Sequence, residues 1–506
     1  MEQTSKENLS IIVQAQNEED TIAKLIWELK LLAPYEIIIV VNGSTDSTAS
    51  IAATMNCMVI HYDSPLGINI GKAIGIRQAK GDILLITDGD IVIRSEQLRS
   101  FIEAIKNGFD VALNDLSWSM YKKSKPHPTA ICKRALNIFL RREDLKVNAF
   151  GAIPFALNRK AVDAIGWWNF ADPPMAQAVA VFKKLRITSP ESVDVITTNK
   201  IRPRQHRTLA KNSPYPRSTS RIIGDHLRAM KYIIDEKGPS DGKERDRLTG
   251  YENTTRLTNP VKYSAIISIE KDPIPKNISN LIKRLKKLEI DEIIVVGYLL
   301  EHNFVNQLKA AGSIVINLSL PTRFFTYRAI GTAACTGECI LFLDGHRTYL
   351  QRHIIPFLKA IDNQEADIAL NNMKHLLLSK KPIEDFDTVN YFLNLSVKRP
   401  DLFCNSLYST PHAIHRRVID KLGTECLSIP PLAQTLAIHN GFKIKSPYSC
   451  KLNPQKNPDI ISIETILVDH LNAFQPHLNC TNERGGFTDG KKNRKLVEEL
   501  KQLDKT

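Results

Sequence analysis

The sequence predicts an α/β protein of two tandem domains, each a mostly parallel sheet covered by helices. Two observations lead to this prediction. Short apolar strands alternate with stretches whose apolar residues recur at helical spacing, as in 10–15, 18–32 and 36–41, and this alternation is typical of a parallel sheet with helices on both faces. The two halves of the chain also match each other with a period of about 255 residues, which indicates a duplicated domain and not a solenoid.

The internal match covers most of both halves. The matched pairs are 9–41 with 263–296, 73–90 with 329–346, 101–115 with 357–372, 172–187 with 429–444, and 222–230 with 466–474. A polar stretch separates the halves, as expected of a linker. The expected boundaries are therefore a first domain at 1–235, a linker at 236–260, a second domain at 261–480 and a docked tail at 481–506.

Length and composition fit a globular protein of two or three domains, with 506 residues of which 43% are hydrophobic and 24% charged. No apolar run approaches the roughly 20 residues that span a bilayer. The polar start of the chain, 1–10, lacks the apolar core of a signal peptide. The eight cysteines are scattered without a zinc-binding spacing, so we expect reduced thiols and a cytoplasmic location.

The formal net charge of +14 favours anionic partners such as nucleotide phosphates or the anionic face of a membrane. The basic residues are dispersed, with modest clusters at 200–207 and 491–495, and no aromatic residues are interleaved with them. An RNA-binding platform requires that interleaving, so no nucleic acid partner is expected. A basic surface that serves only solubility explains the charge equally well.

An acidic turn follows the apolar strand at 82–87, where Asp88 and Asp90 flank Gly89. Ligands of parallel sheets lie beyond the carboxyl ends of the strands, and two aspartates one residue apart on a turn can hold one Mg²⁺ or Mn²⁺. Such a cation suits the loss of a diphosphate, because it neutralises the charge on the leaving group. A tight turn capped by its own aspartates is the structural alternative.

Three further loops accompany this turn in a specific order. The first strand leads into the acidic residues 16–20, the second into the polar loop 42–48, and the segment 67–75 puts Lys72 ahead of the strand of the acidic turn. In this order the chain resembles the family-2 glycosyltransferases, enzymes with the Rossmann-like GT-A fold that use nucleotide-diphosphate sugars. The resemblance is strong over 9–120 and extends weakly towards residue 230.

The resemblance implies roles for the residues that match the family's motifs. Gln14 and Glu18 would face the nucleotide base and ribose. Asn42 stands where the family usually has an aspartate that contacts the base. Lys72 matches the basic residue of the family's GKG-like loop, although Ala73 replaces the second glycine.

For the acidic turn, the resemblance implies a metal site. Asp90 would bind Mg²⁺ or Mn²⁺ directly, and Asp88 would be shared between the metal and the ribose of the nucleotide sugar. The family's reaction moves a sugar from a UDP- or GDP-sugar donor to a hydroxyl group.

Two further site residues are expected later in the first half. An inverting transferase needs a general base, and Asp172 at the head of the predicted helix 171–177 is the candidate, with a helix cap as its alternative role. His206 is the candidate third metal ligand, and the nearby Arg202 suits phosphates. A solvated basic loop is the alternative there, and the family's QxxRW signature is absent. Without an essential carboxylate at 172, a retaining mechanism stays open.

The second half departs from these motifs at each place. His346 replaces the second aspartate, 270–273 replaces the acidic first loop, and 297–301 replaces the polar second loop. A copy that keeps its strands and helices but loses the metal and nucleotide residues is typical of a non-catalytic domain. We expect it to be a scaffold, a dimerisation surface or an acceptor-binding module.

The predicted function is that of a metal-dependent glycosyltransferase, of hexosyl- or N-acetylhexosaminyl-transferring type, with its active site in the first domain. The acceptor would be a hydroxyl group of a cell-envelope polymer, lipid carrier, protein or metabolite, with peripheral membrane contact as an option. Two alternatives stay open. A nucleotidyltransferase is disfavoured because the loop at 14–20 is acidic where that class has a basic, glycine-rich loop. A catalytically silent sugar-nucleotide-binding or scaffold protein is the other.

Overall fold

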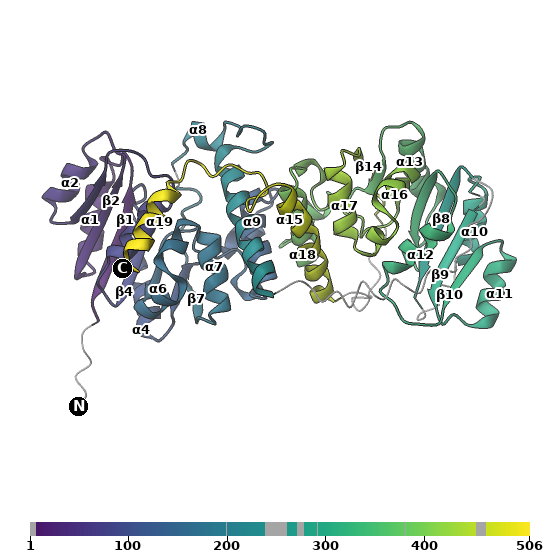
Figure 1. Cartoon of the computed structure of the whole chain (residues 1–506). Coiled ribbons are helices and arrows are strands. Elements are labelled where there is room, and N and C mark those ends of the chain that lie inside the picture. The colour runs from purple at the N-terminus through teal and green to yellow at the C-terminus, as the bar shows by residue number, and fades with distance from the viewer. Residues whose placement is uncertain are drawn as a thin grey trace, which may run out of the picture. The chain divides into compact units, whose positions relative to one another are not determined.

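The computed structural model describes residues 7–198, 200–237, 261–270, 278–290, 292–379, 381–451 and 462–505 (Figure 1). The chain divides into two compact units, residues 1–233 with 481–506, and residues 234–480. Most of the expected linker, and residues 271–273 of the segment that replaces the acidic first loop, lie outside the described residues.

The first unit contains a seven-stranded sheet with the order β3-β2-β1-β4-β6-β5-β7. β6 runs antiparallel to both of its neighbours and the other pairings are parallel, so the sheet is mixed. The strands are β1, Leu9–Ala15; β2, Glu36–Asn42; β3, Met58–Tyr62; β4, Ile83–Asp88; β5, Val111–Asn114; β6, Phe155–Asn158; and β7, Ile187–Glu191.

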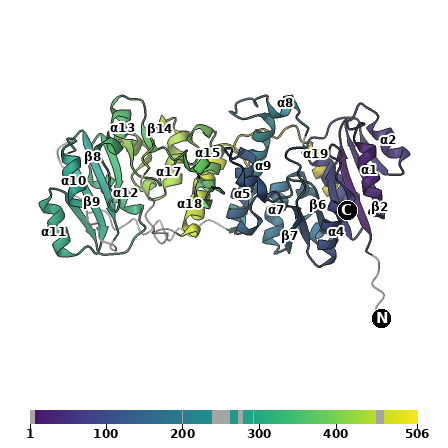
Figure 2. The same cartoon turned by 180° about the vertical axis from the view of Figure 1, so that it is seen from behind.

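Helices connect these strands and cover the sheet (Figure 2). They are α1, Ile22–Lys30; α2, Thr48–Thr54; α3, Ile70–Gln78; α4, Ser95–Lys106; α5, Pro128–Phe139; α6, Arg159–Ile165; α7, Pro173–Phe182; α8, Pro203–His206; and α9, Arg217–Lys237. The helix expected at 18–32 is shorter in the structure, Ile22–Lys30, and the Glu18 carbonyl accepts hydrogen bonds from the Thr21 and Ile22 N–H groups at its start. In the part of the chain that the structure describes, no helix has the length and apolar character needed to cross a membrane.

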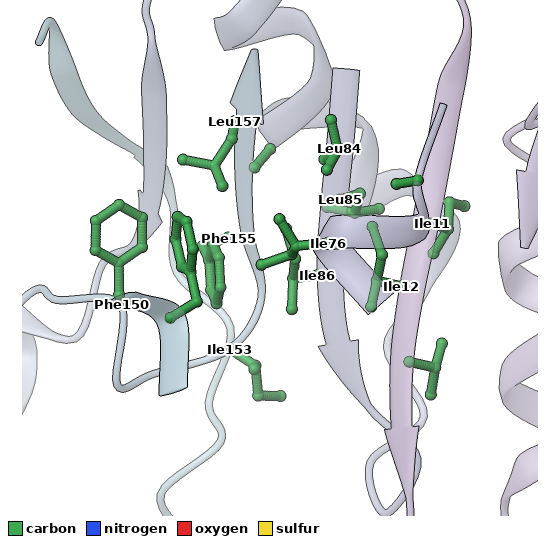
Figure 3. Packing of buried hydrophobic residues seen from close by; sticks show 14 of the residues in the cluster. Ile11, Ile12, Ile76, Leu84, Leu85, Ile86, Phe150, Ile153, Phe155 and Leu157 are labelled. Carbon is green, nitrogen blue, oxygen red and sulfur yellow. The ribbon is translucent and has the colours of Figure 1, made fainter. Parts of the chain in front are cut away.

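The core of the first unit explains why β1 and β4 are continuous apolar runs. Ile11 and Ile12 of β1 and Leu84 and Leu85 of β4 are fully buried, because helices cover both faces of these central strands. Figure 3 shows these side chains in the same cluster as Ile76 of α3 and Phe155 and Leu157 of β6. Burial of this kind fixes the register of the strands, and therefore the position of the residues at their ends.

The second unit repeats the topology of the first. Its seven-stranded sheet has the order β10-β9-β8-β11-β13-β12-β14, in which each strand takes the place of its counterpart in the first sheet. This confirms the prediction of two tandem α/β domains. The strands are β8, Tyr263–Ile269; β9, Glu292–Tyr298; β10, Ile314–Leu318; β11, Cys339–Asp344; β12, Ile368–Asn371; β13, His412–His415; and β14, Ile444–Tyr448.

The helices of the second unit occupy corresponding places between the strands. They are α10, Ile278–Lys286; α11, His302–Ala310; α12, Thr326–Ala334; α13, Gln351–Asp362; α14, Leu376–Ser379; α15, Asp385–Ser396; α16, Arg416–Leu422; α17, Pro430–His439; and α18, Ile463–Cys480. The last helix of the chain, α19 at Arg494–Leu503, lies in the first unit instead, where it packs against α3 and the 3₁₀ turn Trp167–Ala171.

Candidate active site

The acidic turn lies at the point where the strand order of the first sheet reverses. From β1 the chain builds outward through β2 to β3, and then returns to place β4 on the other side of β1. Gln14 of β1 and Asp88 of β4 are register partners at the carboxyl ends of these two strands. In open α/β sheets this is the crevice in which ligands bind, so the sheet places both predicted residues at the expected position.

Gly89 lets the acidic turn press against β1. Its N–H donates to the Gln14 carbonyl at 2.9 Å, and its carbonyl accepts a hydrogen bond from the Thr21 hydroxyl at 2.7 Å. A Cβ at this position would lie 2.9 Å from the Cβ of Ala15, closer than real contacts allow. Packing therefore requires a glycine between the two aspartates.

Lys72 approaches the turn from the first turn of α3. Its ammonium lies 2.9 Å from the Asp88 carboxylate, and its backbone N–H donates to the Gln14 side chain at 3.2 Å. A Cβ on Gly71 would lie 2.9 Å from the Gln14 side chain, so Gly71 makes this approach possible. Burial raises the pKa of the Asp88 carboxyl, and the Lys72 charge offsets that effect only in part.

Glu18 and Asp90 converge on a single cation, the guanidinium of Arg202. Its two terminal nitrogens lie 2.7 Å from the Glu18 carboxylate and 3.0 Å from that of Asp90. Burial raises the pKa of Glu18, and the nearby Asp90 charge raises it further, while Arg202 acts in the opposite direction. Arg202 thus lies beside Asp90 and neutralises the carboxylate that is expected to bind a divalent cation.

The carboxylates of Asp88 and Asp90 on the acidic turn fit Mg²⁺ or Mn²⁺ in the way these ions commonly bind, with one or two carboxylates and the oxygens of a substrate phosphate. Among the described residues, no three side chains of the ligating types lie close enough to hold a metal on their own. A bound nucleotide diphosphate would supply the missing oxygens.

His206 lies beside Arg202, at the end of the short helix α8. Its Nδ1 accepts a hydrogen bond from the backbone N–H of Arg202 at 3.0 Å. Burial and the Arg202 charge lower the pKa of the imidazole, which favours the neutral, metal-binding form. Among the described residues, His206 forms no metal-holding group with Asp88 and Asp90, so its role as a third ligand stays a prediction.

Asn42 grips the loop that leads into α3. Its side-chain carbonyl accepts a hydrogen bond from the Leu66 N–H at 2.6 Å, and its amide donates to the Gly67 carbonyl at 3.2 Å. The residue is 2% exposed. Asn42 therefore shapes the loop between β3 and α3 in this structure, and any contact with a nucleotide base would use its remaining hydrogen-bonding capacity.

The family model of glycosyl transferase family 2 matches residues 10–165, which include β1, the acidic turn and Lys72. Residues 10–165 belong to glycosyl transferase family 2. We refer to the first unit as the family-2 domain.

Curated relatives match part of the chain at low identity. Dolichol-phosphate mannosyltransferase of Pyrococcus furiosus is 27% identical over 130 residues, which is 23% of this chain and 37% of that protein. Undecaprenyl-phosphate 4-deoxy-4-formamido-L-arabinose transferase of Pseudomonas fluorescens is 25% identical over 171 residues, 31% of this chain and 48% of that protein. The match thus spans about half the length of these relatives or less.

Solved structures that match part of the chain include glucosyl-3-phosphoglycerate synthase from Mycobacterium tuberculosis. Its complex with UDP has 17% identity and a TM-score of 0.34, and the match covers 44% of this chain and 80% of that one. Its complex with Mn²⁺, UDP-glucose and phosphoglyceric acid has 17% identity and a TM-score of 0.35, with 44% and 79% coverage.

Asp172 stands at the N-cap position of α7 in the family-2 domain, but its side chain makes no cap hydrogen bond. It is 3% exposed and pairs with three cations, Lys492, Arg228 and Arg494. Burial alone would raise the pKa of this carboxyl, but Arg494 and Lys492 outweigh it and hold the pKa well below the usual range. A carboxylate with so low a pKa is a poor proton acceptor, so the contacts favour an anchoring role for Asp172 over that of general base.

No local sequence pattern marks Lys492 as a residue close to the expected site. The contact between Asp172 and Lys492 spans 320 positions, and neither local motif nor periodicity reports on such a separation. The excess of basic residues at 491–495 was the one available signal.

At the corresponding edge of its sheet, the second unit has an aspartate and an arginine whose contacts differ from those of Asp88 and Lys72. Asp344 of β11 is the register partner of Ser268, but its carboxylate accepts hydrogen bonds from the His346 N–H at 2.9 Å and from Arg347 at 3.3 Å. Arg328, at the place of Lys72, is buried and donates to the Leu407 and Tyr408 carbonyls. The hydrogen bonds of Asp344 thus come from its own turn, and those of Arg328 go to backbone carbonyls.

Proposed function

We propose that the chain is a glycosyltransferase that takes a sugar from a nucleotide-diphosphate donor at the acidic turn of the family-2 domain. One observation carries the proposal: Asp88 and Asp90 lie at the strand-order reversal, with Lys72 on one side and Glu18 and Arg202 on the other. This set has the charges that a sugar diphosphate with its cation requires. Membership of the family supports the activity.

In this proposal Asp88 and Asp90 hold Mg²⁺ or Mn²⁺, with His206 as a further candidate ligand. When bound, the cation would act as a Lewis acid that neutralises the leaving diphosphate. Lys72 adds a fixed positive charge, and its approach from the first turn of α3 aims it at the same edge of the sheet. Gln14, Glu18 and Asn42 are proposed to line the nucleotide side.

Arg202 has two roles in this proposal. Without a donor, its guanidinium neutralises Glu18 and Asp90, which would otherwise repel each other. The side chain is 41% exposed, so it can leave when a divalent cation takes its place. The freed guanidinium is suited to bidentate hydrogen bonds with the phosphates that accompany the cation.

The ion pairs of Asp172 help to decide which kind of acceptor group we propose. A hydroxyl acceptor needs a general base, and Asp172 is held in three ion pairs. A phosphate monoester is largely ionised at neutral pH, because its second pKa is about 6, so its oxygen needs no base. The names of the curated relatives, which are transferases of polyprenyl phosphates, support the same choice. We therefore propose a lipid-linked phosphate acceptor, taken up by a cytoplasmic protein in peripheral contact with the membrane.

The second unit is proposed to be catalytically silent. The carboxylate of Asp344 is occupied by His346 and Arg347 of its own turn, and Arg328 is turned to the backbone. A role as scaffold or as acceptor-binding module is compatible with this arrangement.

Isothermal titration with UDP-glucose, UDP-GlcNAc and GDP-mannose, each with and without Mn²⁺, tests the proposal. We expect one of these donors to bind, more tightly with Mn²⁺ than after chelation, and to be turned over when a short-chain polyprenyl phosphate is added. Failure of all donors to bind with Mn²⁺ present would contradict the proposed activity. Turnover with a simple alcohol but not with the phosphate would contradict the proposed acceptor.

A further inference from the structure

The C-terminal segment 481–505 follows the second unit in the chain but packs into the family-2 domain (Figure 1). Val497 of α19 is buried in the core of that domain. Near the end of the segment, the Asp504 carboxylate accepts hydrogen bonds from Arg77 of α3 at 2.6 Å and from the Trp167 indole at 2.7 Å. These contacts make the C-terminal segment an integral part of the family-2 domain.

Lys492 is the centre of this packing, with a side chain that is 0% exposed. Its ammonium donates to the Ala171 carbonyl and to the Asp225 carboxylate, each at 2.9 Å, and pairs with Asp172. A lysine ammonium has three protons to donate, so all three are used. Lys492 thereby joins the head of α7, where Asp172 lies, to Asp225 of α9.

The same part of the segment holds the loop before α3. The Asn493 N–H donates to the Leu66 carbonyl at 2.7 Å. A Cβ on Gly67 would lie 2.7 Å from the Cα of Lys492, and Gly67 has a φ of +90°, so a glycine is needed for the two backbones to touch. Asn42 at the end of β2 also forms hydrogen bonds with these two loop residues. The loop 66–67 is therefore held from both sides, by β2 and by the C-terminal segment.

This loop leads directly into the donor site. α3 begins at Ile70, and its first turn carries Gly71 and Lys72 to Gln14 and Asp88. A shift of the loop would therefore move the ammonium that is proposed to face the donor. A misplacement of about 1 Å at a reacting centre can cost about 100-fold in rate.

We infer that Lys492 is a positioning residue of the donor site: through the loop 66–67 it fixes α3, and with it Lys72, against Asp88. The inference rests on the proposed function, since it concerns the affinity for the same donor. It makes a residue that follows the second domain a determinant of donor binding in the first.

Three full-length variants test this inference against the wild type. Lys492→Met keeps the unbranched chain and removes the ammonium, and Lys492→Arg keeps the charge in case the methionine variant does not fold. Lys495→Met is the matched control, because Lys495 belongs to the same segment and its side chain is 88% exposed. The measurements are donor affinity by titration with Mn²⁺, hydrogen exchange of residues 64–72, and the melting temperature.

We expect Lys492→Met to weaken donor affinity by about tenfold or more and to speed exchange at 64–72, with Lys492→Arg intermediate and Lys495→Met like the wild type. A lower melting temperature with unchanged donor affinity would show a merely structural role and overturn the inference, as would unchanged exchange of the loop. If the wild type binds no donor, the proposed function fails instead, and faster loop exchange in Lys492→Met would still support the positioning contact.

Discussion

The carboxylate of Asp172 at the head of α7 is paired with the ammonium of Lys492, which lies 320 positions later in the chain. Both side chains are almost fully buried. The pair ties the last segment of the protein to the part of the family-2 domain in which a general base was expected. Its predicted consequences separate an anchoring role for Asp172 from a catalytic one.

Asp172→Asn is expected to destabilise the protein by about 1–3 kcal/mol, because the buried Lys492 ammonium loses one of its two carboxylate partners and keeps only Asp225. Chemical denaturation, followed by fluorescence or circular dichroism, measures this change. A general base would behave differently: the variant would then lose activity while its unfolding free energy stayed close to that of the wild type.

The same carboxylate predicts a pH dependence of stability. Its folded-state pKa is held well below the ordinary value of about 3.9 by Arg494 and Lys492, against the effect of burial. Its contribution is therefore complete above about pH 4 and is lost as the pH falls below that value, because the unfolded chain takes up the proton first. Melting temperatures of the wild type and Asp172→Asn should converge as the pH falls from 4 to 3. A constant difference over that range would refute the assignment.

Asp90→Ala is expected to lower donor turnover by about 100-fold or more, a loss typical of removing a group that stabilises charge in the transition state. The melting temperature should hardly change, since the partner of Asp90 is the partly exposed Arg202 and such pairs contribute little to stability. The matched control is Asp163→Ala, which removes an exposed carboxylate on α6. Wild-type turnover in Asp90→Ala would remove the metal site from the account.

Gly89→Ala is expected to weaken both folding and donor binding. The added methyl group would lie 2.9 Å from the Cβ of Ala15, and overpacking of this kind costs about 1–3 kcal/mol. Gly151→Ala is the control, because its nearest neighbours would lie 3.6 Å and 3.9 Å away. Donor titration and thermal melting compare the two, and equal behaviour would mean that the acidic turn tolerates displacement.

Lys133 of α5 gives a second prediction about pH. Burial, and to a lesser extent the charge of Lys72, lowers its pKa to about 8. Between about pH 8 and pH 10 the unfolded lysine keeps a proton that the folded one has lost, so stability should rise with pH in that window. Lys133→Met should abolish the rise and stabilise the protein at pH 7 by about 1–3 kcal/mol. Parallel pH profiles for variant and wild type would contradict this.

Much of the fold was predictable because its signals are local. The apolar runs of β1 and β4 reflect burial on both faces, and the acidic residues at the end of β4 mark the carboxyl edge where ligands bind. The register then brings Gln14 opposite Asp88 without any further signal. The matched halves likewise predicted two sheets of one topology.

The contacts that the sequence did not reveal are long-range. In this structure Arg202 pairs with Glu18 and Asp90, while its role as a phosphate ligand stays a prediction. Lys492 and Arg494 reach Asp172, the expected base, from the far end of the chain. Neither partner could be assigned from spacing, since only tertiary packing decides which charges meet.

The central claim is that one donor site exists per chain and that it lies at the acidic turn of the family-2 domain. Isothermal titration of UDP and GDP in the presence of Mn²⁺ tests it most directly, on the wild type, Asp90→Asn and Asp344→Asn. We expect one nucleotide to bind per chain in the wild type and in Asp344→Asn, and none to bind in Asp90→Asn. Undiminished binding in Asp90→Asn, or its loss in Asp344→Asn, would contradict it.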